Sequence, residues 1–100
     1  MSNTYVSATY LWTVDSTGNL ETEGCTVTRV IYFPSAVNDD FQLTDTSDNL
    51  AIPLKASASD TSPVHIDLTG EHGGGRRLPS LKVGTIDGGT AYVFLRKEEY

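Results

Sequence analysis

The segment 70–77, GEHGGGRR, combines the residue types best suited to binding an anion. Its glycines allow backbone N–H groups to approach a phosphate, and Arg76 and Arg77 add positive charge. A nucleotide-binding loop requires instead a lysine and then a serine or threonine at the start of a helix, and Pro79 leaves no room for one. We therefore weigh two other interpretations. The segment is either a mobile loop or a loop that becomes ordered on a neighbouring protein, whose acidic groups would meet the arginines.

Histidine and acidic side chains offer two weak candidates for a metal site. His65 and Asp67 alternate along a predicted strand and share one face, but zinc needs three or four ligands and the chain has only two histidines and one cysteine. The acidic segments 38–40 and 45–49 flank one short strand without the spacing of a calcium-binding loop. The sequence favours a solvated sheet face for the histidine and hydrogen-bonded turns for the acidic segments. It predicts no metal and no cofactor.

Residues for nucleophilic catalysis are not arranged in a recognisable motif. The sequence has no Gly-x-Ser-x-Gly element, and Cys25 has no helix N-terminus or basic neighbour that would lower its pKa. Glycoside hydrolysis uses a pair of carboxylates, and a chain with thirteen acidic residues always contains such pairs. That reaction needs a deep pocket, however, and a β domain of 100 residues rarely encloses one. The prediction is that the protein is not an enzyme, with a small hydrolase as an alternative.

Composition narrows the classes of partner. The formal net charge of −6 argues against nucleic acid and against an anionic membrane surface, because both attract basic proteins. No apolar run approaches the roughly 20 residues that span a bilayer, and the N-terminus shows no signal peptide. A single cysteine, Cys25, excludes an intrachain disulfide, which is typical of synthesis in a reducing cytoplasm.

Apolar residues alternate with polar ones along most of the chain, and this period of two predicts strands. The segments 4–14, 25–33, 41–43, 50–56, 64–68, 81–85 and 91–96 are the expected strands. Pro53 places the fourth of these at a sheet edge, and the turn residues 87–90 predict a hairpin between the last two. No helical period is present. The expected fold is a single all-β domain, an antiparallel sandwich or jelly-roll-like barrel of about seven or eight short strands, with an N-terminal arm (1–4) and a C-terminal tail (97–100).

Aromatic residues allow a second function class, a carbohydrate-binding module with a platform of exposed rings. Tyr10 and Trp12 share the apolar face of the predicted strand 4–14, so the core is the better place for both. Tyr32 and Tyr92 remain open as candidates.

The segment 28–39, TRVIYFPSAVND, with the short strand, aspartate-rich turn and strand that follow it, resembles small structural proteins of tailed bacteriophages. The later segments LPS (78–80) and GGTAYV (88–93) match further features of those proteins, so the resemblance covers about residues 25–96. It implies a decoration or cement protein that binds the major capsid protein on the virion surface, assembles as an oligomer with a trimer favoured, and is made in the host cytoplasm. A head-fibre, neck or tail accessory protein is the alternative within the same class.

The surfaces by which such proteins bind a capsid have no sequence motif. We therefore choose the expected contact residues by their polarity, charge and position in the chain. The N-terminal arm is polar and free to reach a neighbour, which selects Ser2, Asn3, Thr4 and Tyr5. The segment 71–78 holds the densest positive charge of an acidic chain, which selects Glu71, His72, Arg76, Arg77 and Leu78.

Overall fold

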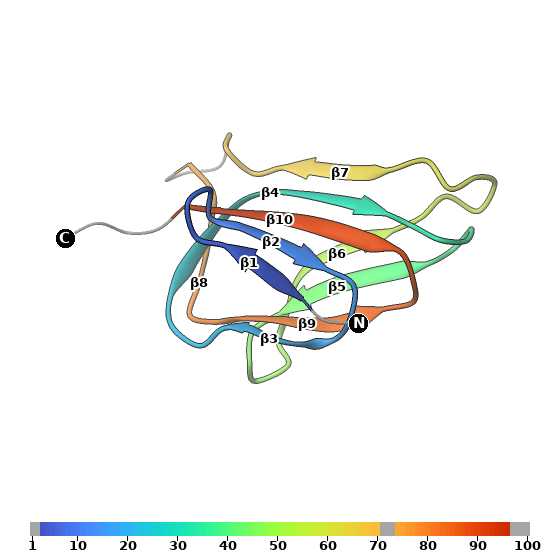
Figure 1. Cartoon of the computed structure of the whole chain (residues 1–100). Coiled ribbons are helices and arrows are strands. Elements are labelled where there is room, and N and C mark those ends of the chain that lie inside the picture. The colour runs from blue at the N-terminus through green and yellow to red at the C-terminus, as the bar shows by residue number, and fades with distance from the viewer. Residues whose placement is uncertain (1–2, 71–73, 97–100) are drawn as a thin grey trace.

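The computed structural model describes residues 3–70 and 74–96, and within them it is a β-sandwich without helices (Figure 1). Six strands form one antiparallel sheet in the order β1-β2-β10-β4-β7, with β8 also beside β4, and four form a second sheet in the order β3-β9-β5-β6. The all-β sandwich is therefore confirmed. The strands are β1 (Thr4–Val6), β2 (Leu11–Val14), β3 (Gly18–Glu21), β4 (Cys25–Phe33), β5 (Asp40–Thr44), β6 (Leu50–Lys55), β7 (Val64–Asp67), β8 (Arg76–Leu78), β9 (Leu81–Ile86) and β10 (Thr90–Arg96).

Residues 3–70 and 74–96 form ten strands in place of the seven or eight expected, because several are too short to display an alternating pattern. β8 has three residues and begins within the segment 70–77, for which the sequence predicts a loop. Pro53 does lie in an edge strand, β6, as its missing N–H requires.

The core fills the space between the two sheets. Tyr32 of β4 stacks on Phe41 of β5 with ring centroids 5.1 Å apart, so this pair joins the centres of the two sheets. Both rings are fully buried, as are Leu43 and Val93 from opposite sheets. Burial of such side chains is the main source of the stability of a domain this small.

A bulge in β4 changes which residues of that strand face the core. Val27 pairs with Leu95 and Arg29 with Phe94, so Thr28 is the extra residue. Its hydroxyl donates to the Phe94 carbonyl at 3.2 Å and its carbonyl accepts from the Leu68 N–H at 2.8 Å, so the bulge is hydrogen-bonded. Cys25, Thr26 and Val27 are buried before the bulge, and the even-numbered Val30 and Tyr32 are buried after it.

The expected single strand over 4–14 is wrong, because β1 and β2 form a hairpin around the turn 7–10. Tyr10 adopts a left-handed conformation (φ 53°) in this turn and is exposed, so it does not join the core. Apolar residues happen to alternate through the turn as well, so the sequence contains no indication that the chain reverses there.

The expected hairpin at 87–90 is also wrong. β9 belongs to the four-stranded sheet and β10 to the six-stranded sheet, so this turn carries the chain from one sheet to the other. Gly89 has a φ of +83°, and the Gly88 carbonyl accepts a hydrogen bond of 2.6 Å from the Tyr32 hydroxyl. Asp-Gly-Gly allows the backbone to turn tightly. The same residues suit a hairpin within one sheet and a turn that leads from one sheet to the other, so they do not distinguish the two.

The Tyr32 hydroxyl should lose its proton only at a higher pH than an ordinary tyrosine. Burial, with Asp39 and Asp87 nearby, raises the pKa of Tyr32 to about 12. Since the folded state favours the neutral phenol, this contribution to stability is complete below pH 10 and is lost as the pH rises toward 12. An ultraviolet titration of phenolate, with circular dichroism in parallel, should show a late-ionising tyrosine signal that disappears in Tyr32→Phe. Ionisation of every tyrosine near pH 10 while the fold persists would contradict the assignment.

Candidate protein-binding surface

The predicted N-terminal arm is not free over the residues that the structure describes. The Asn3 side chain donates to the Ser16 carbonyl at 3.0 Å and accepts from the N–H groups of Asp15 and Ser16 at 3.0 and 3.2 Å. Thr4 and Tyr5 belong to β1, and the Tyr5 ring packs on Trp12 with centroids 5.0 Å apart. The prediction of a free N-terminal arm is therefore wrong for Asn3, Thr4 and Tyr5. Side-chain hydrogen bonds fix Asn3 to residues 15 and 16, and pairing with β2 fixes Thr4 and Tyr5 in the sheet. Ser2 lies outside the described residues.

The expected contact residues at the end of the segment 71–78 likewise belong to a strand. Arg76, Arg77 and Leu78 form β8, which pairs with the first residues of β4, and Leu78 is buried. Arg76 donates a hydrogen bond of 2.9 Å to the carbonyl of Ala51, the extra residue of a bulge in β6, and so joins the two sheets. Loss of binding in an Arg76→Ala variant would therefore be inseparable from loss of stability. Glu71 and His72 lie outside the described residues.

The acidic segments act as turns. The Asp39 carboxylate accepts hydrogen bonds from the Ser35 hydroxyl and from the N–H groups of Ser35 and Ala36, which lower the pKa of Asp39. Asp45 does the same for Ser47 and Asn49, and its pKa is also lowered. Across residues 3–70 and 74–96 no group of three potential metal ligands is present.

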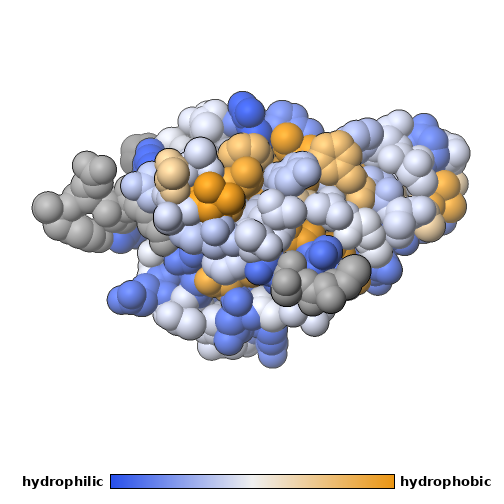
Figure 2. Space-filling model, viewed as in Figure 1, coloured by the Kyte–Doolittle hydropathy of each residue, from blue (hydrophilic) through white to orange (hydrophobic). Residues whose placement is uncertain are grey.

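The outer side of the six-stranded sheet carries an unexpected set of apolar side chains. Register and alternation place them on the side away from the core, in neighbouring positions of β1, β2, β10 and β4. Figure 2 shows hydrophobic side chains gathered over these strands. We call this surface the outer apolar face, and it consists of Val6, Leu11, Ile31, Phe33, Tyr92 and Phe94.

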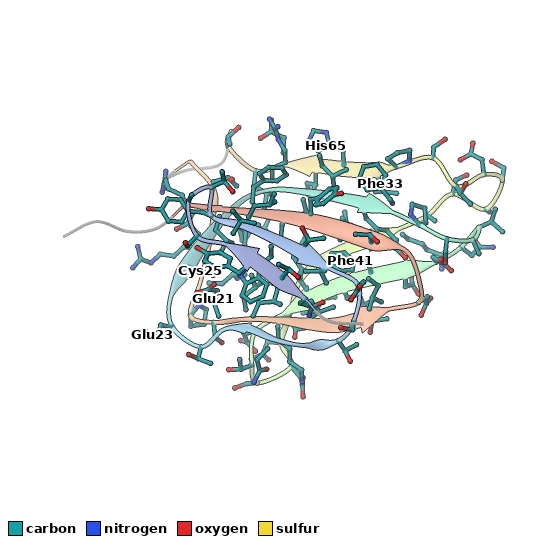
Figure 3. The ribbon with its side chains drawn as sticks, in the orientation of Figure 1. Glu21, Glu23, Cys25, Phe33, Phe41 and His65 are labelled. Carbon is teal, nitrogen blue, oxygen red and sulfur yellow. The ribbon has the colours of Figure 1, made fainter. Side chains whose placement is uncertain are left out.

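Aromatic contacts organise this face. Phe33, which is 40% exposed and labelled in Figure 3, meets Tyr92 edge to face with centroids 5.6 Å apart. The Arg29 guanidinium lies over the Phe94 ring at 5.9 Å and its Nη2 is 3.8 Å from Asp67. The charged groups of the face thus gather toward β7, while its centre is apolar.

The outer side of the four-stranded sheet provides the comparison. Its strands present mainly polar residues there, among them Asn19, Gln42, Lys82 and Thr85, with Leu50 as an exposed apolar exception. This is the usual pattern for a sheet that faces water on one side. Since the same chain builds one polar and one apolar outer side, the apolar one is a specific feature of the six-stranded sheet, and such patches mark interaction sites.

Trp12 does not contribute to an exposed platform. It lies opposite Val93 on the inner side of the sheet, packs against the core, and donates from Nε1 to Glu21 at 2.9 Å. Tyr32 is fully buried, so Tyr92 is the one of the two open candidates that reaches the outer side.

Sequence reasoning missed the outer apolar face although a signal was present. The runs Val30–Phe33 and Ala91–Leu95 are apolar at every position, and such runs provide apolar residues on both sides of a strand. Two such runs on neighbouring strands therefore indicate a sheet that is apolar on both sides.

Comparison of the chain with protein-family models, with curated proteins and with solved structures finds no match. In the described part of the chain, no helix is long and apolar enough to cross a membrane.

Proposed function

We propose that this protein is a non-enzymatic structural protein that binds a larger protein assembly through its outer apolar face. The single observation that carries the proposal is the contrast between this face and the polar outer side of the other sheet. Aromatic residues at the centre and charged residues at the margin are the usual composition of a protein-binding surface. A sheet face built from apolar side chains also suits binding better than catalysis, which needs an enclosed pocket.

The assembly that we propose is the head shell of a tailed bacteriophage, with the major capsid protein as the direct partner. The resemblance of residues 28–39 and 88–93 to phage structural proteins supports this choice of partner. The mechanism is mechanical. Many copies bind across adjacent capsid subunits and raise the free energy needed to separate them, and the same contacts stabilise the small domain by mass action.

Quantitative mass spectrometry of purified phage particles tests the proposal. We expect copy numbers comparable to that of the capsid subunit, together with loss of heat resistance in particles that lack the protein. A handful of copies per particle would favour the neck or tail alternative. Complete absence from particles would overturn the virion proposal and leave the glycan-binding module, with Phe33 and Tyr92 as its exposed rings, as the next candidate.

A further inference from the structure

We infer that β7 is a self-association edge: it pairs antiparallel with β7 of a second copy, with Ile66 opposite Ile66 across a two-fold axis. The inference goes beyond the proposed function and does not depend on the identity of the capsid partner. It rests on the backbone, the side-chain order and the ends of this one strand.

The outer edge of β7 presents unpaired backbone groups. β7 is the last strand of the six-stranded sheet and is uppermost in Figure 1. The Leu68 N–H donates to the Thr28 carbonyl at 2.8 Å, which fixes the alternation along β7. Residues 64, 66 and 68 therefore direct their backbone groups toward β4, and the N–H and C=O groups of His65 and Asp67 point outward.

Residues at both ends of β7 prevent the outward-facing backbone hydrogen bonds from continuing beyond the strand. Pro63 precedes the strand and has no N–H to donate. Beyond Asp67, the next outward N–H is that of Thr69, which donates to the Asp67 carboxylate at 2.9 Å. The available ladder is thus limited to His65 and Asp67. Only the register with these two residues opposite each other uses all of it, and it gives four hydrogen bonds.

The side chains in that register are complementary to themselves. In the segment 64–68, apolar and ionisable residues alternate in the same order on both sides of Ile66, with His65 on one side and Asp67 on the other. On the outer side, His65 of each copy lies opposite Asp67 of the other, which places an imidazole beside a carboxylate twice. On the inner side the half-buried Val64 and Ile66 face Leu68 and Ile66 of the second copy, so further apolar surface is covered.

The other edges of the two sheets are less suitable. β6 carries Pro53, which lacks a donor, and β3 contains a bulge at Leu20. β1 and β8 have three residues each and offer shorter ladders. β7 is also the edge where the charged groups of the outer side gather, since Arg29 lies 3.8 Å from Asp67.

Pairing through β7 has a direct structural result. The two-fold axis runs perpendicular to the joined sheet, so both outer apolar faces point to the same side. One dimer then presents twice the binding surface and engages two neighbouring partner subunits, which raises apparent affinity without new contacts.

Sedimentation equilibrium of the complete chain, in the absence of any partner, tests the inference. We expect a concentration-dependent mass that reaches twice 10.8 kDa. His65→Glu places two carboxylates opposite each other at both symmetric positions and should raise the dimer dissociation constant about tenfold. The matched control is Asn19→Glu, at a residue that is also exposed, on edge strand β3 and with the same change of charge, and this variant should have no effect.

Cross-linking tests the register. Ile66→Cys places two thiols across a non-hydrogen-bonded pair with Cα atoms about 4.5 Å apart, within the range for a disulfide. Mild oxidation should give a covalent dimer, whereas His65→Cys, opposite Asp67, should give little. A monomer up to millimolar concentration, a trimer, equal effects of the two glutamate variants, or equal cross-linking at 65 and 66 would each overturn the inference. Particle occupancy is measured separately, so failure of the proposed capsid function leaves this result unaffected.

Discussion

Replacing Phe33 and Tyr92 together by serine is expected to lower the affinity for the partner about a thousandfold. Tyr92 lies in the middle of the outer apolar face, opposite Ile31, and the Phe33 ring at the end of β4 meets it edge to face with centroids 5.6 Å apart. Removing one buried aromatic residue from the centre of an interface costs about 2 kcal/mol or more, and each 1.4 kcal/mol is a factor of ten. Because both rings lie on the outer side, the fold should lose only their mutual contact, about 1 kcal/mol.

The measurement is occupancy of purified particles by added protein, with the free energy of unfolding determined in parallel. The matched control is Gln42→Ser with Thr85→Ser, a neighbouring pair on the outer side of the four-stranded sheet. The control should bind like the original chain. If both double variants bind equally well, the outer apolar face is not the binding surface.

Gly89→Ala is expected to unfold the protein or lower its melting temperature by about 10–20 °C. A Cβ at this position would lie 2.0 Å from the Phe33 carbonyl oxygen and 3.0 Å from the Pro34 Cα, both of which are backbone atoms. The φ of +83° adds strain of about 1–2 kcal/mol for a residue with a side chain. With displacement of the β4 end, the loss should reach about 3 kcal/mol or more, out of a total of roughly 5–15 kcal/mol.

Gly70→Ala is the matched control, since an added Cβ there meets nothing within 4 Å. Thermal unfolding followed by circular dichroism should show little change for this variant. A melting temperature for Gly89→Ala close to that of Gly70→Ala would mean that the turn between β9 and β10 relaxes freely, contrary to the close contacts of Gly89.

Strands with strong local signals were predictable from the sequence. Pro34 ends β4 where the apolar pattern stops, and the alternation of Ile52 and Leu54 with Pro53 identified β6 as an edge strand. In these segments the period of two and the position of proline both follow from the geometry of one strand. Such signals are contained within a few residues and need no knowledge of the neighbouring strands.

Features that depend on the pairing of distant segments were not predictable. The turn at 87–89 has the same chemistry whether it joins paired strands or crosses between sheets, and β8 is defined by its pairing with Cys25–Val27. Thr28 reads as an ordinary strand residue, yet as a bulge it decides which side chains of β4 face outward. The outer apolar face follows from that bulge, so the contact residues chosen from polarity and charge lay elsewhere.

The position of β10 also determines when this chain can fold during synthesis. β10 lies between β2 and β4 and supplies residues to both the core and the outer apolar face, although it is the last strand among the described residues. A growing polypeptide therefore lacks the centre of the six-stranded sheet until residue 96 has left the ribosome. Until then β2 and β4 have unpaired edges, and most strand pairings join segments far apart in sequence, a topology that folds slowly. Nascent chains should depend on chaperones that shield these edges, and premature termination within residues 90–96 should yield insoluble protein.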